Sequence, residues 1–244
     1  MLLSLLKRSD FRDLAPFMSP ALLSVVPLGA TLRRCSSVVA GASRSNSKEF
    51  DVLSRRFDGW VCMGGGNGIP LSNLSDQARE SVGRKILQVY FAQLFYGEST
   101  RIDLRARAWS VVDGELHWSP SAGSIRWESG FIEPMRGVYR AYYDGDDAGF
   151  NSSLHELGLG SAAHIFREHL GSDNPDRVQF DRDLFVQSFG KVFEHCKSKG
   201  LRLHPDFVLL GIYLAALYDA LDVIGLPLNV RAAFRAAVSQ STQR

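Results

Sequence analysis

The residue types that could carry chemistry are spread thinly along this chain of 244 residues. His164 and His169 lie on one predicted helix with Glu168 between them. The zinc-protease pattern HExxH needs two histidines four apart on one helix face, whereas these are five apart and would not share a face. His195 and Cys196 are adjacent on another predicted helix, and adjacent helix residues point apart. These groups therefore predict neither a metal site nor a catalytic thiol.

Two other stretches match ligand-binding loops only in part. Asp144, Asp146 and Asp147 suggest a calcium loop, but the Gly and the distant Glu do not fall at the positions of an EF-hand, so we interpret them as an Asp-rich helix N-terminus. The glycines at 64–68 end a short apolar strand predicted within 58–71. Ile69 and Pro70 follow them and supply neither the Lys-Ser/Thr of a P-loop nor the helix of a Rossmann turn. We therefore predict a flexible turn there.

The overall composition limits the class of protein. The formal net charge is +2, and 45% of the residues are hydrophobic while 22% are charged. These values are typical of a soluble globular protein, and so small a net charge leads us to expect no nucleic-acid binding. Cys35, Cys62 and Cys196 are odd in number and far apart, which fits neither a disulfide framework nor a zinc site. They favour a reducing compartment.

Residues 1–48 differ in composition from the rest of the chain. They are rich in Ser, Ala and Leu, and their Lys and Arg residues outnumber Asp10 and Asp13. The uncharged stretch 14–32 contains three prolines, which would break a membrane-spanning helix. We expect this segment to be either poorly structured or an organellar transit peptide, which is basic, Ser-rich and poor in acidic residues. The first alternative predicts a bacterial, cytoplasmic protein, and the second a mitochondrial or plastid one.

Residues 49–244 are predicted to form one mainly α domain with a small β-hairpin. Apolar residues at helical spacing, with helix start and stop signals, predict helices at 75–96, 131–143, 147–157, 161–170, 181–199 and 207–224. The last of these is apolar on more than one side, so we expect it to be the central core helix. Asp113 and Gly114 predict the turn of the hairpin. Glu133 and Pro134 are expected to start the helix that follows it.

Several of these stretches resemble the C-terminal half of the UbiB/AarF family of atypical protein-kinase-like proteins. YRAYYDGDDAGFNSSLHELGL at 139–159 is similar to the family's "gD...F...L.elG" helix. LRLHPDFVLLGIYLAALYDALDVIGLPLNVRAAF at 201–234 is similar to its closing helix. VCMGGGNGIPLSNL at 61–74 is similar to its hinge strand, and 75–96 to the helix before the catalytic loop. The resemblance covers about 58–236 and implies a protein-kinase-like C-lobe, a helical array with a small hairpin.

The departures from the family pattern bear on activity. The family's catalytic loop, H-x-D-P-H-P-G-N, aligns with RIDLRARA at 101–108. Asp103 falls at the catalytic-base position, but Ala108 replaces the metal-binding Asn. The metal-binding Asp of the DFG motif becomes Pro120 or Ser121, depending on the alignment. Since phosphoryl transfer depends on a divalent ion, the resemblance implies a domain that has lost catalysis.

The first part of the chain also departs from the family. The hinge Glu is replaced by Gly64. The Ala/Gly-rich nucleotide loop, the Lys–Glu pair and the KxGQ helix have no match in residues 1–58, so the N-lobe is expected to be missing. We therefore expect no cofactor, although ATP and Mg²⁺ serve intact members of the family. The surface where the N-lobe would dock is expected to be an exposed apolar face that binds a protein partner or a second copy.

The favoured function is a pseudokinase or interaction module. The resemblance would connect it with ubiquinone or other isoprenoid-lipid metabolism, through peripheral membrane or lipid association. Asp103 is expected to be a solvated loop carboxylate rather than a working base, and Asp113 to belong to the hairpin turn. Three alternatives stay open: a residual ATP-dependent kinase or ATPase, an unrelated all-helical binding protein, and the product of a decaying gene or a locally shifted reading frame.

Overall fold

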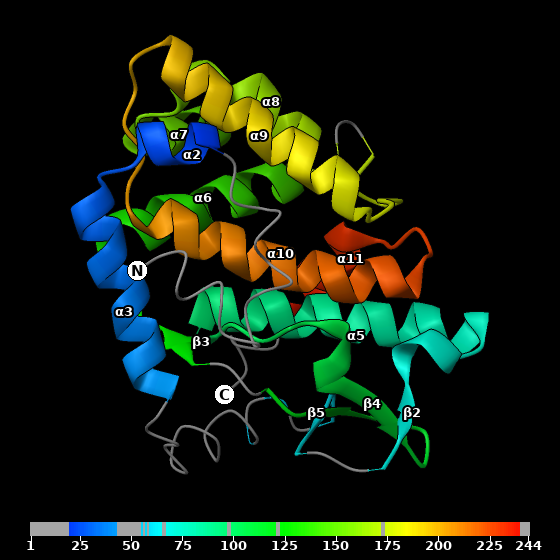
Figure 1. Ribbon diagram of the computed structural model, residues 1–244. Coiled ribbons are helices and arrows are strands. Elements are labelled where there is room, and N and C mark those ends of the chain that lie inside the picture. Colours follow the sequence, from blue (N-terminus) through cyan, green and yellow to red (C-terminus); the bar gives the residue numbers. More distant parts are fainter. Residues whose placement is uncertain are drawn as a thin grey trace.

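A computed structural model describes residues 20–42, 55, 57, 59–64, 67–96, 99–120, 123–171 and 174–239. Within these ranges the protein is mostly helical with a small sheet, as the sequence predicts. Helix α10 (Asp206–Ile224) runs through the middle of the molecule, between α5 (Asp76–Tyr96) and α9 (Arg182–Ser198) (Figure 1). The sequence-based prediction of a central core helix is therefore confirmed.

Helix α10 owes its central place to apolar residues on every side. Fourteen of its residues are buried, and the helix ends where Gly225 adopts the left-handed conformation (φ 70°). Among the described residues it is the one helix long and apolar enough to cross a membrane, with a mean hydropathy of 1.9. However, 72% of that stretch is buried inside the molecule, and a core helix of a soluble protein passes the same test.

Helix α5 packs along α10 through aromatic residues. The ring of Tyr90 stacks on that of Tyr213, with centroids 5.0 Å apart. On another side, Phe91 and Phe95 meet Phe234 of α11 (Val230–Ser239) edge to face, at centroid distances of 5.3 and 5.4 Å. Such pairs add stability beyond their buried area. The sequence analysis predicted α5 but did not predict α11 as a separate helix.

The remaining predicted helices are all present, with shifts of one or two residues at most ends. They are α6 (Ser129–Asp144), α7 (Asp147–Glu156) and α8 (Ala163–His169), the last preceded by the 3₁₀ helix η4 (Gly160–Ala162). Asp146 caps α7 by accepting a hydrogen bond from the backbone N–H of Gly149, as its Asp-rich N-terminus predicts. The expectation that Glu133 and Pro134 start α6 is wrong, because the helix already begins at Ser129 and Pro134 lies inside it.

The strands form two small sheets. In the first, β1 (Cys62–Met63), β5 (Glu115–Trp118), β4 (Trp109–Val112) and β2 (Ile69–Pro70) lie in that order, with β1 parallel to β5. In the second, β3 (Thr100–Arg101) pairs with β6 (Ser124–Ile125). The predicted hairpin joins β4 and β5, and its turn has positive φ angles at Asp113 (50°) and Gly114 (83°). The 3₁₀ helices η2 (Leu71–Asn73) and η3 (Ala106–Ala108) adjoin the first sheet.

The N-terminal segment contains two helices, α2 (Pro20–Val25) and α3 (Leu28–Ala42), which differs from the poorly structured segment that its composition suggested. Their apolar side chains contribute to the core, as shown by Leu22, Val25 and Cys35, each at most 3% exposed. The composition is misleading here because an amphipathic helix needs only about half of its residues to be apolar in order to pack. Residues 1–19 and 43–48 lie outside the described part, and the transit-peptide alternative stays a prediction.

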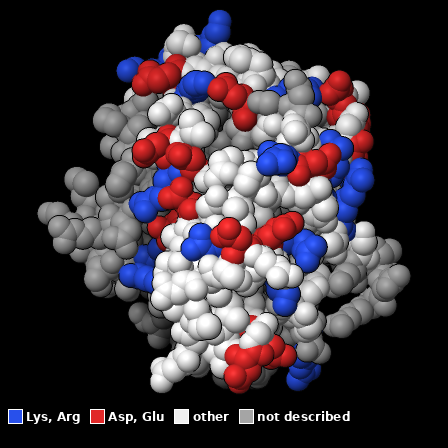
Figure 2. Space-filling model, turned by 90° about the vertical axis from the view of Figure 1, so that its right-hand side faces the viewer, with Lys and Arg blue, Asp and Glu red and all other residues white. Residues whose placement is uncertain are grey.

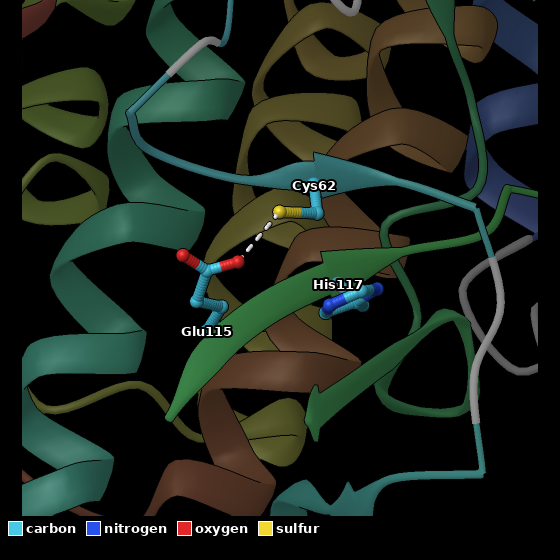
Figure 3. A group of neighbouring side chains, drawn as sticks. All are labelled: Cys62, Glu115 and His117. Carbon is cyan, nitrogen blue, oxygen red and sulfur yellow. Dashed lines mark hydrogen bonds between the residues drawn. The ribbon is translucent and has the colours of Figure 1, made fainter. Parts of the chain in front are cut away.

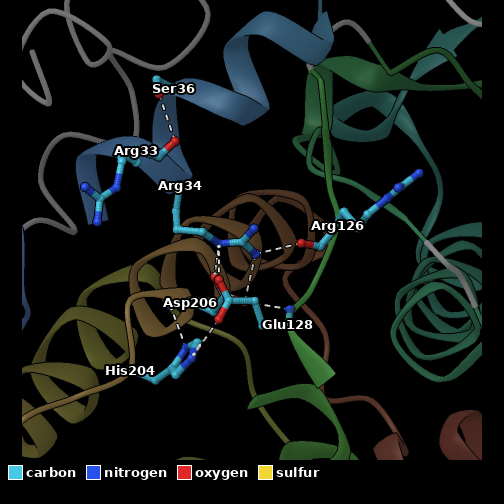
Figure 4. Close-up of polar contacts among 7 residues, drawn as sticks. All are labelled: Arg33, Arg34, Ser36, Arg126, Glu128, His204 and Asp206. Atoms are coloured by element: carbon cyan, nitrogen blue, oxygen red, sulfur yellow. Dashed lines mark hydrogen bonds and ion pairs between the residues drawn. The ribbon is translucent and has the colours of Figure 1, made fainter. Parts of the chain in front are cut away.

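An ion pair fixes α3 to the start of α10 (Figure 4). The guanidinium of Arg34 binds both carboxylate oxygens of Asp206, at 2.6 and 2.9 Å, and donates to the backbone oxygen of Arg126 at 2.6 Å. Asp206 is fully buried and also accepts the backbone N–H of Glu128 at 3.0 Å. Buried carboxylates need such partners, so these contacts hold α3, α6 and α10 together.

Candidate functional site

The candidate catalytic loop lies between β3 and β4 and carries Asp103. This side chain is 1% exposed, and its Oδ1 forms an ion pair of 2.7 Å with Nε of Arg105, which is itself 2% exposed. The expectation of a solvated carboxylate at this position is therefore wrong. The physical reason is the basic residue two positions later, which neutralises Asp103 and allows both groups to be buried.

Two tryptophans of the hairpin close over this loop. The indole N–H of Trp118 donates to the backbone oxygen of Asp103 at 2.9 Å, and that of Trp109 donates to the backbone oxygen of Leu104 at 2.8 Å. The two rings stack with centroids 5.2 Å apart and an interplanar angle of 11°. A buried Trp needs a partner for its N–H, and here the loop backbone supplies it. The hairpin thus fixes the backbone of the loop at Asp103 and Leu104.

The central helices hold the other side of the loop. Asp219 of α10 accepts the backbone N–H of Ala106 at 3.0 Å. Gln93 of α5 accepts the N–H of Arg101 at 2.8 Å and donates to the hydroxyl of Tyr213 at 3.1 Å. The loop is therefore fixed by side chains from both helices as well as by the hairpin, which leaves its backbone little freedom.

The second sheet brings the two ends of this region together. Strand β3 precedes Asp103 and pairs with β6, which follows the hairpin, and the N–H of Ile102 donates to the oxygen of Gly123 at 3.2 Å. Ala108 and Pro120 are at the positions that align with metal ligands of the family. Their side chains have no oxygen with which to hold a divalent ion. Ser121, the other aligned position, lies outside the described residues.

Three other residues with metal-binding side chains come together in the first sheet. A donor atom of each of Cys62, Glu115 and His117 lies within 4.8 Å of the other two. The sequence analysis did not group them, because they are brought together by the pairing of β1 with β5, which local patterns do not reveal. Cys62 lies 53 positions before Glu115, a separation that matches no metal-binding motif.

In the part of the chain that the structure describes, the pairs His164–His169 and His195–Cys196 considered from the sequence do not form a site. His195 contacts Ser161 through a hydrogen bond of 2.9 Å, and its ring centroid lies 6.0 Å from that of His164. Cys196 is fully buried, which raises the pKa of its thiol to about 11 and keeps it protonated near neutral pH. Cys196 therefore lacks the thiolate character of a nucleophile.

A cavity of about 300 Å³ between α8 and α9 contains a Ser–His pair that sequence reasoning missed. Nδ1 of His169 lies 3.0 Å from Oγ of Ser188, and this hydroxyl donates to the backbone oxygen of Phe185 at 3.1 Å. The imidazole must then donate its own proton to Ser188, the reverse of what nucleophile activation requires. Desolvation among aromatic rings lowers the pKa of His169 to about 4. The pair is therefore a structural contact of the two helices.

The face of the molecule in Figure 2 carries charges of both signs. Its acidic and basic side chains are interspersed. The large apolar side chains that are at least half exposed are Leu28 of α3, Ile69 of β2 and Leu184 of α9, which belong to three different elements. The apolar docking face expected from the missing N-lobe stays a prediction.

No protein-family model matches this sequence, and no curated protein matches it either. The resemblance described from the motifs therefore stays a prediction that rests on the residues quoted for it.

Proposed function

We propose that this chain is a protein-kinase-like C-lobe of the UbiB/AarF type that no longer transfers phosphate and acts as an interaction or pseudokinase module. The order of its elements supports the proposal. Helix α5 leads to the loop of Asp103, the hairpin β4–β5 follows, β6 returns to β3, and a helical array leads through α10 to α11. This is the order in which the motifs of the resemblance occur along the chain.

The pairing of β3 with β6 gives a second reason. In a working kinase, the base in the catalytic loop and the metal-binding Asp after the hairpin act on one phosphate group, so the two segments must lie close together. Here the hydrogen bond between Ile102 and Gly123 joins the corresponding segments. This pairing supports the proposal that the two segments are arranged as in a kinase-like C-lobe.

The burial of Asp103 is the observation that best supports the proposed loss of catalysis. A general base must come within hydrogen-bond reach of the group whose proton it takes. Asp103 is 1% exposed and is paired with Arg105 at 2.7 Å. A substrate hydroxyl could reach the carboxylate only if this buried ion pair opened. With Ala108 at the place of the magnesium ligand, the loop has no second group for phosphoryl transfer.

An ATP turnover assay tests this proposal directly. We expect the purified chain to release no phosphate from MgATP above a no-protein background, and to transfer none to itself or to a small-molecule acceptor. The Asp103→Asn variant should give the same result as the wild type. Turnover that depends on Mg²⁺, persists after further purification and falls in Asp103→Asn would contradict the proposal and favour the residual kinase or ATPase. Circular dichroism must show that the variant is folded, and Asp113→Asn provides the matched control.

The partner of the module is proposed from the resemblance and not from a particular contact. It is either a second copy of the chain or another protein, with lipid association in a ubiquinone-related or other isoprenoid-lipid process. Light scattering on the purified chain distinguishes the first two. A mass of twice 27.0 kDa supports self-association, whereas a mass of 27.0 kDa at all accessible concentrations restricts the partner to a different protein.

A further inference from the structure

Cys62, Glu115 and His117 lie on one face of the first sheet (Figure 3). Cys62 in β1 and His117 in β5 are direct partners across the parallel strand pair. Glu115 precedes His117 by two positions in the same strand, and residues two apart in a strand point to the same face. Strand pairing and strand periodicity therefore place the three side chains together.

The distances among the donor atoms suit one shared cation. Sγ of Cys62 lies 3.2 Å from Oε2 of Glu115, and all three donor atoms lie within 4.8 Å of one another. Around tetrahedral zinc, with bonds of about 2.0–2.3 Å, donors are separated by roughly 3.3–3.8 Å. Closing the remaining gap needs only side-chain rotation, because Glu115 is exposed and the other two are half-buried.

We propose that Cys62, Glu115 and His117 bind one divalent cation of the zinc type. A thiolate and an imidazole select zinc and similar transition metals, whereas Mg²⁺ and Ca²⁺ prefer oxygen ligands throughout. Three protein ligands leave a fourth coordination position for water or for a ligand from a partner. The site is separate from the Mg²⁺ site of a kinase, since it contains neither Asp103 nor the positions that follow the hairpin.

Binding would have a defined effect on the fold. The thiol of Cys62, which donates to Glu115 in the absence of metal, would lose its proton to solvent when the metal–sulfur bond forms. The cation would then link β1 to β5, the strand whose Trp118 covers the loop of Asp103. Metal binding would thus stabilise the hairpin against the segment that precedes α5.

A titration with Co²⁺ as a spectroscopic substitute for zinc tests the proposal on the full chain after treatment with a chelator. We expect a cobalt–thiolate charge-transfer band that saturates at one equivalent and disappears when Zn²⁺ displaces the cobalt. Cys62→Ser should abolish the band. Loss of an outer-shell partner of a metal typically weakens metal binding by about 10–100-fold, so loss of the direct ligand in His117→Gln should weaken binding by more than about tenfold. Glu115→Gln should weaken it as well.

Matched controls separate this site from adventitious binding. Cys196→Ala removes a buried thiol, and His155→Gln removes an exposed imidazole on α7, so both should bind as the wild type does. Zinc should raise the unfolding temperature of the wild type and of both controls but not of Cys62→Ser, whose fold is checked by circular dichroism. The absence of a thiolate band, an unchanged band in Cys62→Ser, or one ion per two chains would overturn the proposal.

Discussion

The ion pair of Asp103 and Arg105 gives the most specific prediction about the loop. Replacing Asp103 with Asn keeps the size of the side chain but removes the carboxylate that pairs with the buried guanidinium of Arg105. Replacing Arg105 with Met removes the guanidinium that pairs with the buried carboxylate of Asp103. If the pair is structural, each substitution should destabilise the protein strongly, and the double substitution should cost less than the two singles together.

The magnitude follows from the burial and the distance. The two side chains are 1% and 3% exposed and their charged atoms are 2.7 Å apart. Removing one partner of a buried pair typically costs about 3–5 kcal/mol, because the remaining charge is uncompensated. For a chain of this length, about 3 kcal/mol lowers the melting temperature by roughly 6–12 °C. The double variant removes both charges, so we expect a coupling energy of about 2 kcal/mol or more between the two positions.

Urea denaturation followed by tryptophan fluorescence is a suitable assay, because Trp109 and Trp118 both donate to the loop backbone. Asp113→Asn is the matched control: it makes the same chemical change in the exposed hairpin turn, where Asn tolerates the positive φ of 50°. It should change the free energy of unfolding by less than about 0.5 kcal/mol. If Asp103→Asn is as stable as the control and shows no coupling to Arg105, the pair does not hold the loop and the reasoning is refuted.

Three further predictions concern other parts of the structure. Arg34→Met should lower the free energy of unfolding, measured in urea, by about 3 kcal/mol, because it removes the guanidinium that pairs with the buried Asp206. Arg34→Lys should not recover the full stability of the wild type, since lysine lacks the planar guanidinium that binds both carboxylate oxygens. His169 has a pKa lowered from 6.5 to about 4, so the unfolded state takes up a proton first as the pH falls through this window. Stability should therefore fall by about 1.4 kcal/mol per pH unit there, and His169→Gln should show a flatter dependence; an equal slope in both proteins would contradict this. Gly68→Ala would place a Cβ atom 2.7 Å from a carbonyl oxygen of β4 and should lower the free energy of unfolding by about 1–3 kcal/mol. Gly130→Ala in α6, which has open space around it, is the control and should be neutral or stabilising. Thermal melts of the two variants measure the difference.

Most of the helices could be predicted because the residues that define a helix and its ends lie within or next to that helix. The apolar spacing before Ile224 and the left-handed Gly225 determine where α10 lies and ends. Asp113 and Gly114 likewise supply the φ angles of the hairpin turn without help from distant residues. Helix α3 was missed because its stability depends on the contact of Arg34 with Asp206, 172 positions away.

The candidate site was harder to predict, because its contacts also join residues that are far apart in the sequence. The burial of Asp103 could not be predicted, because Trp118, which bonds to the backbone oxygen of Asp103, is fifteen positions away and its place depends on how the hairpin folds back. The group of Cys62, Glu115 and His117 depends on a parallel pairing of β1 with β5 that no turn or periodic pattern encodes. Residue types and spacing define local elements, whereas side chains from separate elements meet only through the tertiary fold.

The measurement that tests the central claim most directly is thermal denaturation of the full chain with and without millimolar MgATP. A ligand that binds only the native state stabilises it by about 2.7 kcal/mol at a hundredfold excess over its dissociation constant, which corresponds to roughly 5–10 °C for a chain of this length. We predict a cooperative transition that does not move. A shift of several degrees that requires both ATP and Mg²⁺ would mean that the chain holds a metal–nucleotide site, and would contradict the proposal that this site has been lost.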